Sequence, residues 1–123
     1  MTRRYALALD LADDPHLIAE YERHHTQVWP AIEDSLRAAG IGRLEIYRTG
    51  TRLFMVLEAS PAFSFDAKAA ADAANPVVQE WERLMWTYQR ALPWATPGQK
   101  WLLMDRIYEW PQPANEHPEG TQP

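Results

Sequence analysis

A phenol, an imidazole and an indole recur at intervals of four residues in the first quarter of the chain, at Tyr21, His25 and Trp29. Residues four apart share one face of a helix, so these three rings would lie in a row. Pro30 opposes continuation of that helix, because it has no N–H to donate and it disfavours helical dihedral angles at Trp29. We therefore predict a kink or a restart near Trp29, with His25 about one turn before it.

The imidazole of His25 is the group in this row that titrates nearest neutral pH, which suits a proton donor. The alternative is a helix histidine whose ring is satisfied by a backbone carbonyl. His24 would point elsewhere on the helix, toward solvent. Adjacent histidines lack the spacing of a zinc site, His16 and His117 are isolated, and the chain has no cysteine, so we expect no metal site.

Two carboxylates, Glu45 and Glu58, lie at or near the ends of predicted strands. Strand alternation places them on the faces that carry Tyr47 and Phe54 and not on the faces that carry leucines. If that face is open, both acids could line a pocket. Equally, they could be rim residues paired with neighbouring arginines.

The aromatic residues suggest a class of ligand. Trp81 falls on the apolar stripe of a predicted helix, whereas Trp86 lies on its polar side. Together with one imidazole and several carboxylates, and without a phosphate-binding glycine loop, these rings fit cofactor-free acid–base chemistry on a small polar molecule. A carbohydrate suits them, since indole faces cover C–H patches while carboxylates and amides bind hydroxyls.

The elements that must position these side chains are predicted from periodicity and from helix-start signals. Asp14-Pro15, Ser60-Pro61 and Asn75-Pro76 each pair a capping residue with a proline suited to the first helical position. Thr49-Gly50-Thr51 is typical of a hairpin. The predicted elements are a strand at Tyr5–Leu11, an interrupted helical region at Pro15–Ala39, strands at Arg43–Arg48 and Arg52–Glu58, helices at Pro61–Ala73 and Pro76–Ala91, and a strand within Trp101–Trp110.

This order of elements predicts an α+β fold of the ferredoxin-like βαββαβ type, with a four-stranded antiparallel sheet and helices on one face. The other face would expose Tyr47, Phe54 and Val56. A second copy or a ligand pocket should cover it, and a homodimer packed through the sheets is the expected solution.

Composition and net charge exclude several classes of partner and bound the number of domains. The chain has 123 residues and a net charge of −5, which argues against nucleic acid and anionic membranes as partners. No apolar run approaches the length of a membrane span. We expect one domain over residues 1–110, a disordered tail over residues 111–123, and a soluble cytoplasmic protein.

At Tyr21-x-x-x-His25-x-x-x-Trp29-Pro30 the sequence resembles the L-rhamnose mutarotase family. The likeness continues through Ile46-Tyr47, Leu53-Phe54-Met55, Gln79-x-Trp81 and Met85, and covers nearly the whole chain to Pro111. The resemblance implies a dimeric α+β barrel of ferredoxin-like subunits. It also implies cofactor-free interconversion of the α and β anomers of a 6-deoxy-L-sugar. By matching positions, His25 would be the proton donor, and Tyr21 and Trp81 would contact the sugar.

Two positions depart from the rhamnose-specific pattern. Leu44 stands where those family members carry a tyrosine, and Glu82 stands where they carry a second tryptophan. Both positions contact sugar in the family, and the sequence around Asn75-Pro76 and Trp81-Glu82 looks more like the branch assigned to L-fucose. The resemblance therefore implies L-fucose as the favoured substrate and L-rhamnose as the next.

Mutarotation needs an acid at the ring oxygen and a base at the anomeric hydroxyl. We expect His25 to be the acid, and Glu45, Glu58, Glu82 or Tyr47 to be the base. Two rival functions remain: another dimeric α+β barrel enzyme, such as a small monooxygenase or a lactone isomerase, and a non-catalytic sugar-binding module. In the enzymatic account, the residues that line the sugar site are Tyr21, Trp29, Tyr47, Trp81 and Glu82.

Overall fold

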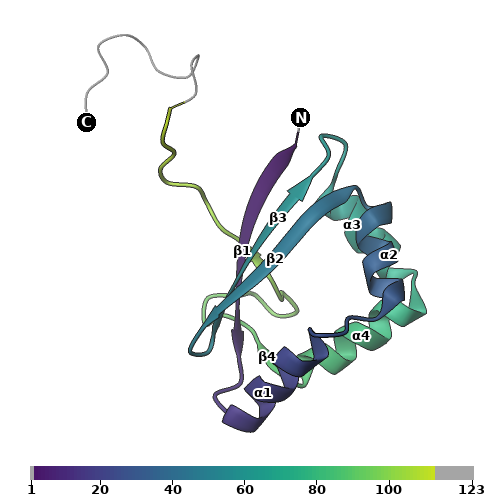
Figure 1. Cartoon of the computed structure of the whole chain (residues 1–123), viewed down its shortest axis with the longest axis vertical. Coiled ribbons are helices and arrows are strands. Elements are labelled where there is room, and N and C mark those ends of the chain that lie inside the picture. The colour runs from purple at the N-terminus through teal and green to yellow at the C-terminus, as the bar shows by residue number, and fades with distance from the viewer. Residues whose placement is uncertain (1, 113–123) are drawn as a thin grey trace.

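The computed structural model describes residues 2–112 of the chain. Within these residues, an antiparallel sheet lies on one side and the four helices lie on the other (Figure 1). The elements are β1 Arg3–Leu11, α1 Pro15–His24, α2 Pro30–Ala38, β2 Ile41–Thr49, β3 Arg52–Ala59, α3 Phe65–Ala73, α4 Pro76–Trp86, β4 Gln89–Arg90 and β5 Leu102–Leu103. The predicted α+β, ferredoxin-like fold is confirmed.

The sheet has the strand order β2-β3-β1-β4, and β5 also pairs with β1. The sequence predicts four strands, whereas the sheet has five within the described residues, because two short strands, β4 and β5, pair with the same edge of β1. β4 pairs with Asp10 and Leu11, and β5 pairs with Leu7 and Ala8. β3 lies antiparallel to both β1 and β2, and its turn at Gly50 has the positive φ of 55° that glycine adopts without strain.

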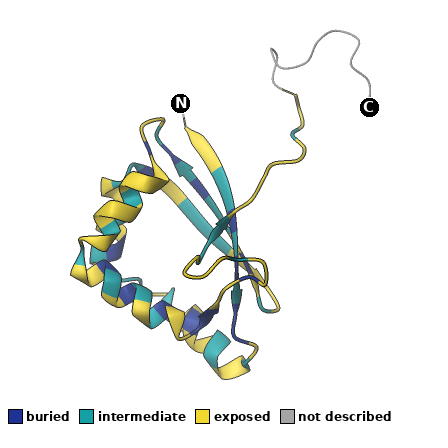
Figure 2. Cartoon of the chain, turned by 180° about the vertical axis from the view of Figure 1, so that it is seen from behind, coloured by how far each residue is buried: buried dark blue, intermediate teal, exposed yellow. Residues whose placement is uncertain are grey.

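The two sheet faces follow the alternation seen in the sequence. Pairing of Leu7 with Met55, and of Met55 with Ile46, places these apolar side chains on the face that meets the helices. Pairing of Ala8 with Phe54, and of Phe54 with Tyr47, places those on the opposite face, where Tyr47 and Phe54 are exposed. Strands and helices accordingly show bands of buried and exposed residues (Figure 2).

Three of the four helices begin with a proline at the first position. Asp14 and Asn75 cap α1 and α4 by accepting hydrogen bonds from backbone N–H groups, as predicted. The predicted break near Trp29 is a restart: α1 ends at His24 and α2 begins at Pro30. Trp29 has ψ of 135°, the extended conformation that a following proline imposes.

The third predicted helix start, at Ser60-Pro61, is wrong. The chain makes a turn there, with the Phe63 N–H donating to the Ser60 carbonyl, and α3 begins only at Phe65 with Ser64 as its cap. The turn brings Phe63 into the core beside the ring of Tyr5, at 5.9 Å between centroids. Burial of this ring outweighs the local capping signal.

Two C-terminal predictions are also corrected. The helix from Pro76 ends at Trp86 and not at Ala91, because residues 88–90 turn away to join the edge of β1. The strand predicted within Trp101–Trp110 is confined to Leu102–Leu103, and its last contact with β1 in the described chain is the hydrogen bond from the Met104 N–H to the Ala6 carbonyl, at 2.7 Å. Apart from Pro111 and Gln112, the predicted disordered tail lies outside the described residues.

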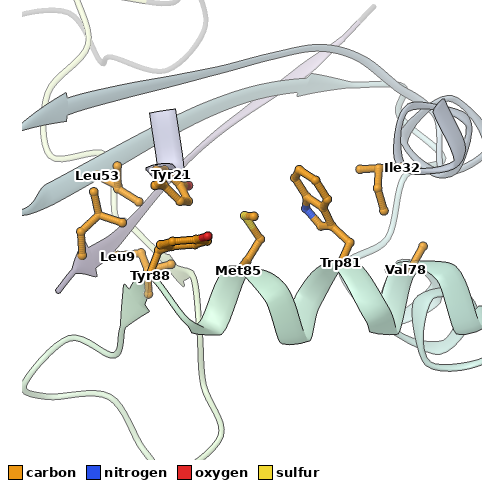
Figure 3. Packing of buried hydrophobic residues seen from close by; sticks show 9 residues of the cluster. Leu9, Tyr21, Ile32, Leu53, Val78, Trp81, Met85 and Tyr88 are labelled. Atoms are coloured by element: carbon orange, nitrogen blue, oxygen red, sulfur yellow. The ribbon is translucent and has the colours of Figure 1, made fainter. Parts of the chain in front are cut away.

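The core between sheet and helices is formed by two adjoining clusters. The larger contains Leu9, Leu53 and Met85, and Figure 3 shows Met85 projecting from α4 toward the sheet. The smaller contains Leu7, Leu57 and Phe63. Trp101 packs against both clusters and so links them. No helix in the described part of the chain is long and apolar enough to cross a membrane.

Removal of the Asp14 side chain tests whether the N-terminal cap of α1 stabilises the protein. The Asp14 carboxylate accepts hydrogen bonds from the N–H groups of His16 and Leu17, at 2.8 and 3.3 Å. Asp14→Ala should therefore lower the free energy of unfolding by about 0.5–2 kcal/mol, measured by urea denaturation. Asp13→Ala, one residue earlier at an exposed position, is the matched control. Equal effects of both substitutions would contradict a capping role.

Candidate active site

A cavity of about 440 Å³ lies between the sheet and the helices. His25, Tyr21, Trp81 and Glu82 line it together, although they come from two helices and the segment that follows one of them. Its sheet wall consists of apolar residues from all three long strands. The cavity therefore lies on the helix-covered face, not on the open face considered from the sequence.

His25 follows the last residue of α1, and its half-buried ring lies 4.4 Å from the ring of Tyr21 and 5.9 Å from that of Trp81. Its Nδ1 is 2.8 Å from the carbonyl oxygen of Tyr21. A carbonyl oxygen can only accept a hydrogen bond, so Nδ1 carries a proton and Nε2 of the neutral ring is left as the exchanging nitrogen. The His25 ring is thus hydrogen-bonded to the Tyr21 carbonyl and also lines the cavity.

The electrostatic setting of His25 disfavours its charged form. Burial lowers the pKa of His25 below its ordinary value of 6.5, and the neighbouring His24 acts in the same direction. The hydrogen bond to the Tyr21 carbonyl partly opposes this shift. The imidazolium of His25 is consequently a stronger acid than that of a solvated histidine.

Tyr21 is the most enclosed of the predicted site residues, with 3% of its surface exposed. Burial raises the pKa of its hydroxyl to about 12, so the group remains an O–H donor at neutral pH. The side-chain Nε2 of Gln89 donates to the Tyr21 oxygen at 3.2 Å.

Trp81 forms an aromatic wall of the cavity and is 6% exposed. Trp29 meets it edge to face at 5.0 Å between ring centroids, but Trp29 is not among the residues that line the cavity. Trp29 therefore supports the ring of Trp81 from behind. His24, expected in solvent, is half-buried instead and bonds the Tyr88 hydroxyl at 3.1 Å, because the end of α1 packs against α4.

A charged pair interrupts the apolar lining near the C-terminal half of α4. The Lys100 ammonium lies 2.6 Å from the Glu82 carboxylate and 4.6 Å from the centre of the Trp86 ring. The Lys100 side chain is 12% exposed, and burial lowers its pKa, although Glu82 opposes the shift. Both members of the pair line the cavity, so it holds a carboxylate and a cation within reach of a polar ligand.

The structure does not bring Glu45, Glu58 and Tyr47 together with His25 in this cavity. Glu45 is bonded to Arg43 at 2.8 Å, which lowers the pKa of its carboxyl, and the Tyr47 hydroxyl donates to Glu45 at 3.2 Å. The side chains of all three lie on the open sheet face, because strand alternation turns them away from the helices.

Glu58 is also paired on the sheet, and a second hollow lies next to the central cavity. Glu58 pairs with Arg4 at 3.2 Å, which agrees with the rim-residue interpretation of the two carboxylates. Tyr47 also borders a second hollow at the β2 edge, which has His25 and Tyr21 in common with the central cavity.

Sequence reasoning missed Gln89 and Lys100, which line the same cavity. Gln89 is 3% exposed, and within residues 2–112 its Oε1 has no hydrogen-bond partner. Neither residue belongs to a periodic pattern, since Gln89 lies in a two-residue strand and Lys100 in a loop. No group of three or more His, Asp or Glu side chains with metal-binding geometry occurs within residues 2–112.

The family model and the relatives that match this chain in the following comparison are all named as mutarotases. A family model described as L-rhamnose mutarotase matches residues 4–110. The chain is 48% identical over 108 residues to the L-fucose mutarotase of Xanthomonas campestris pv. campestris, covering 86% of each chain. It is 32% identical over 93 residues to the L-rhamnose mutarotase of Acidiphilium cryptum, covering 74% of this chain and 86% of that one.

Two solved structures share the fold. The L-rhamnose mutarotase from Formosa agariphila superimposes with a TM-score of 0.64 at 19% identity, covering 87% of this chain and 97% of that one. The tetracenomycin F2 cyclase from Streptomyces glaucescens gives a TM-score of 0.54 at 20% identity, covering 90% and 99%. At such identities the likeness concerns the fold alone.

Proposed function

The chain belongs to the L-rhamnose mutarotase family, and we propose on this premise that it is an isomerase interconverting the α and β anomers of a 6-deoxy-L-hexose. L-Fucose is the favoured substrate and L-rhamnose the next. The observation that carries the proposal is the His25 ring, held by the Tyr21 carbonyl beside an aromatic-walled cavity. A volume of about 440 Å³ falls within the range of roughly 300–1,000 Å³ typical of small-molecule pockets.

The preference for L-fucose is supported by the relative named for that sugar at 48% identity. It is also supported by Leu44 and Glu82, the two residues that depart from the rhamnose-specific pattern, because both line the cavity. L-Fucose and L-rhamnose differ in hydroxyl orientation at C2 and C4. A site that hydrogen-bonds one hydroxyl discriminates against an epimer that leaves its polar groups unpaired.

In the proposed reaction, the anomeric hydroxyl loses its proton, the bond between C1 and the ring oxygen breaks, and the ring oxygen gains a proton. The product is the open-chain aldehyde, whose C1–C2 bond rotates before the ring closes on the other face. Closure reverses both proton transfers. Each transfer to or from a positioned group contributes roughly 10²–10⁴-fold.

His25 is the proposed acid toward the ring oxygen, through Nε2 of its imidazolium form. Among the bases considered from the sequence, Glu82 is the proposed partner at the anomeric hydroxyl, since it lines the same cavity while Glu45, Glu58 and Tyr47 do not. Proximity in one enclosed space favours Glu82, because proton transfer requires hydrogen-bond reach or one bridging water.

Tyr21 and Trp81 are the proposed sugar contacts. The Tyr21 hydroxyl stays protonated and can donate to a sugar oxygen. The indole of Trp81 offers an apolar surface for the C6 methyl group and the C–H face of the ring. Trp29 acts through Trp81 in this account, since it contacts that ring from outside the cavity.

The proposed function is tested by saturation-transfer NMR of anomer exchange in L-fucose and L-rhamnose, with and without the protein. We expect faster exchange for both sugars and the larger acceleration for L-fucose. Binding of L-fucose without faster exchange would indicate a sugar-binding module. Indifference to both sugars would overturn the proposal and leave another enzyme of this fold.

The pH dependence of exchange follows from the direction of the His25 pKa. Because burial lowers this pKa below 6.5, the imidazolium becomes populated only as the pH falls through the lowered value. The imidazolium protonates the ring oxygen, so kcat/KM corrected for uncatalysed exchange should rise on acidification and fall as the pH rises past that pKa. The measurement is the exchange rate from about pH 4 to about pH 8. A rate that instead rises with pH through this region would assign His25 the role of base.

The finer features of the assembly remain part of this proposal. Residues 1–110 act as one domain in the cytoplasm, and two subunits pack through the open sheet face, where Tyr47 and Phe54 are exposed. Light scattering coupled to size-exclusion chromatography should give the mass of a dimer. A monomer at micromolar concentration would contradict the sheet-packed pair.

A further inference from the structure

We propose that the Gln89 side-chain amide binds one hydroxyl group of the sugar and at the same time orients the Tyr21 hydroxyl toward another. This inference rests on the proposed function and deepens it, because it adds a substrate-binding residue that selects among sugars by the position of a hydroxyl.

The position of Gln89 is set by the sheet edge. The backbone of residues 88–90 is fixed there, because the Ala12 N–H donates to the Tyr88 carbonyl at 2.8 Å and Leu11 is the register partner of Gln89. Register partners place their side chains on the same sheet face, so Gln89 shares the helix-facing side with Leu11. Its side chain is therefore carried into the wall of the central cavity.

Gln89 is unusual in its surroundings. Apart from the aromatic residues, Gln89 is the one buried residue within residues 2–112 that has a polar side chain, and its register partner Leu11 belongs to the larger cluster. Its Nε2 donates to Tyr21, whereas its Oε1 is buried without a partner. Rotating the amide by 180° would exchange these atoms and still leave one of them unpaired.

Buried polar atoms in native proteins nearly always have a partner, so an unpaired amide oxygen in a cavity wall points to a ligand group. An oxygen acceptor requires an O–H or N–H donor. A sugar hydroxyl meets this requirement.

The second half of the proposal concerns Tyr21. Its oxygen already receives the Gln89 N–H, so its own proton is free to point elsewhere. The phenol stays protonated at neutral pH, since burial raises its pKa to about 12. The pair thus places one unpaired acceptor and one free donor in residues that line the cavity, which is complementary to two hydroxyls of one sugar ring.

The test uses Gln89→Met, which keeps the length of the side chain and removes both hydrogen-bonding atoms. Its kcat/KM for anomer exchange is compared with that of the native protein on L-fucose and on 2-deoxy-, 3-deoxy- and 4-deoxy-L-fucose. We expect a loss of roughly 10- to 100-fold on L-fucose. One deoxy sugar, which lacks the bound hydroxyl, should lose little or nothing. Gln27→Met, at an exposed position outside the cavity, is the matched control and should leave all rates unchanged.

A structural role for Gln89 predicts a different pattern. An equal loss on every sugar, or no loss on any, would overturn the proposal. If Gln89→Met does not fold, as judged by circular dichroism, Gln89→Asn retains the amide but withdraws it by one methylene, and the same sugar-dependent pattern is expected. Failure of the native protein to accelerate exchange would count against the proposed function alone. Calorimetric titration with L-fucose would then test Gln89 by itself, with weaker binding to the variant expected and equal binding overturning the proposal.

Discussion

Replacement of His25 by Gln is expected to slow the catalysed anomer exchange of L-fucose by roughly 10²–10⁴-fold. Glutamine keeps a polar side chain of similar reach but cannot take up and release a proton near neutral pH. The fold should survive, because His25 lies after the last residue of α1 and is only half-buried. Saturation-transfer NMR at a fixed sugar concentration measures the rate.

The matched control for this change is His16→Gln. His16 is exposed in the first turn of α1 and is not among the residues that line the cavity, so its replacement should leave the exchange rate unchanged. The pH-dependent rise on acidification should also disappear from the His25 variant. Exchange within a few-fold of the native rate, in protein that retains its circular dichroism, would remove His25 from the mechanism.

Truncation of Trp81 to Ala is expected to lower the free energy of unfolding by about 3–5 kcal/mol. The indole is 6% exposed and meets the ring of Trp29 at 5.0 Å and that of His25 at 5.9 Å. Its loss enlarges an existing cavity and removes one ring contact from each of these two residues. The expected change is a large fraction of the roughly 5–15 kcal/mol that stabilises a typical domain. Urea denaturation with a common slope measures the effect.

Trp94→Ala is the control for this substitution, because Trp94 is 66% exposed and the guanidinium carbon of Arg52 lies 5.8 Å from the centre of its ring. Its effect on unfolding should stay below about 1 kcal/mol. Trp81→Phe then separates stability from function, since a smaller ring retains part of the wall. Comparable destabilisation by the two alanine variants would show that Trp81 does not hold the helices against the sheet.

Prediction of the fold from the sequence succeeded where the signal was local. The alternation in β1, β2 and β3, and the caps at Asp14 and Asn75, depend on residues close together in the chain. It failed where a distant contact decided the outcome. Phe63 is buried in the core, and α3 begins only after it, at Phe65. Gln89 pairs with the edge of β1, so it does not belong to the helix that periodicity extends to Ala91.

The site divides in the same way. The spacing of Tyr21 and His25 indicated one shared surface, and the structure places both on the cavity. Glu45 and Glu58 could be assigned to a sheet face by alternation, but which face carries the cavity depends on where the helices pack. Lys100 and Gln89 reach the cavity from a loop and a short edge strand, for which the local sequence carries no periodic signal.

By itself, the sequence determined the order of the long strands and the helices, the apolar faces of β1, β2 and β3, the restart at Pro30 and the family resemblance around His25. These properties follow from the backbone preferences and side-chain periods of neighbouring residues. Only the tertiary structure decided that the cavity lies beneath the helices, that Glu82 faces Lys100, and that Gln89 enters the cavity wall with an unpaired oxygen. Such contacts join residues distant in the chain, because burial of apolar surface and satisfaction of polar groups are settled over the whole molecule at once.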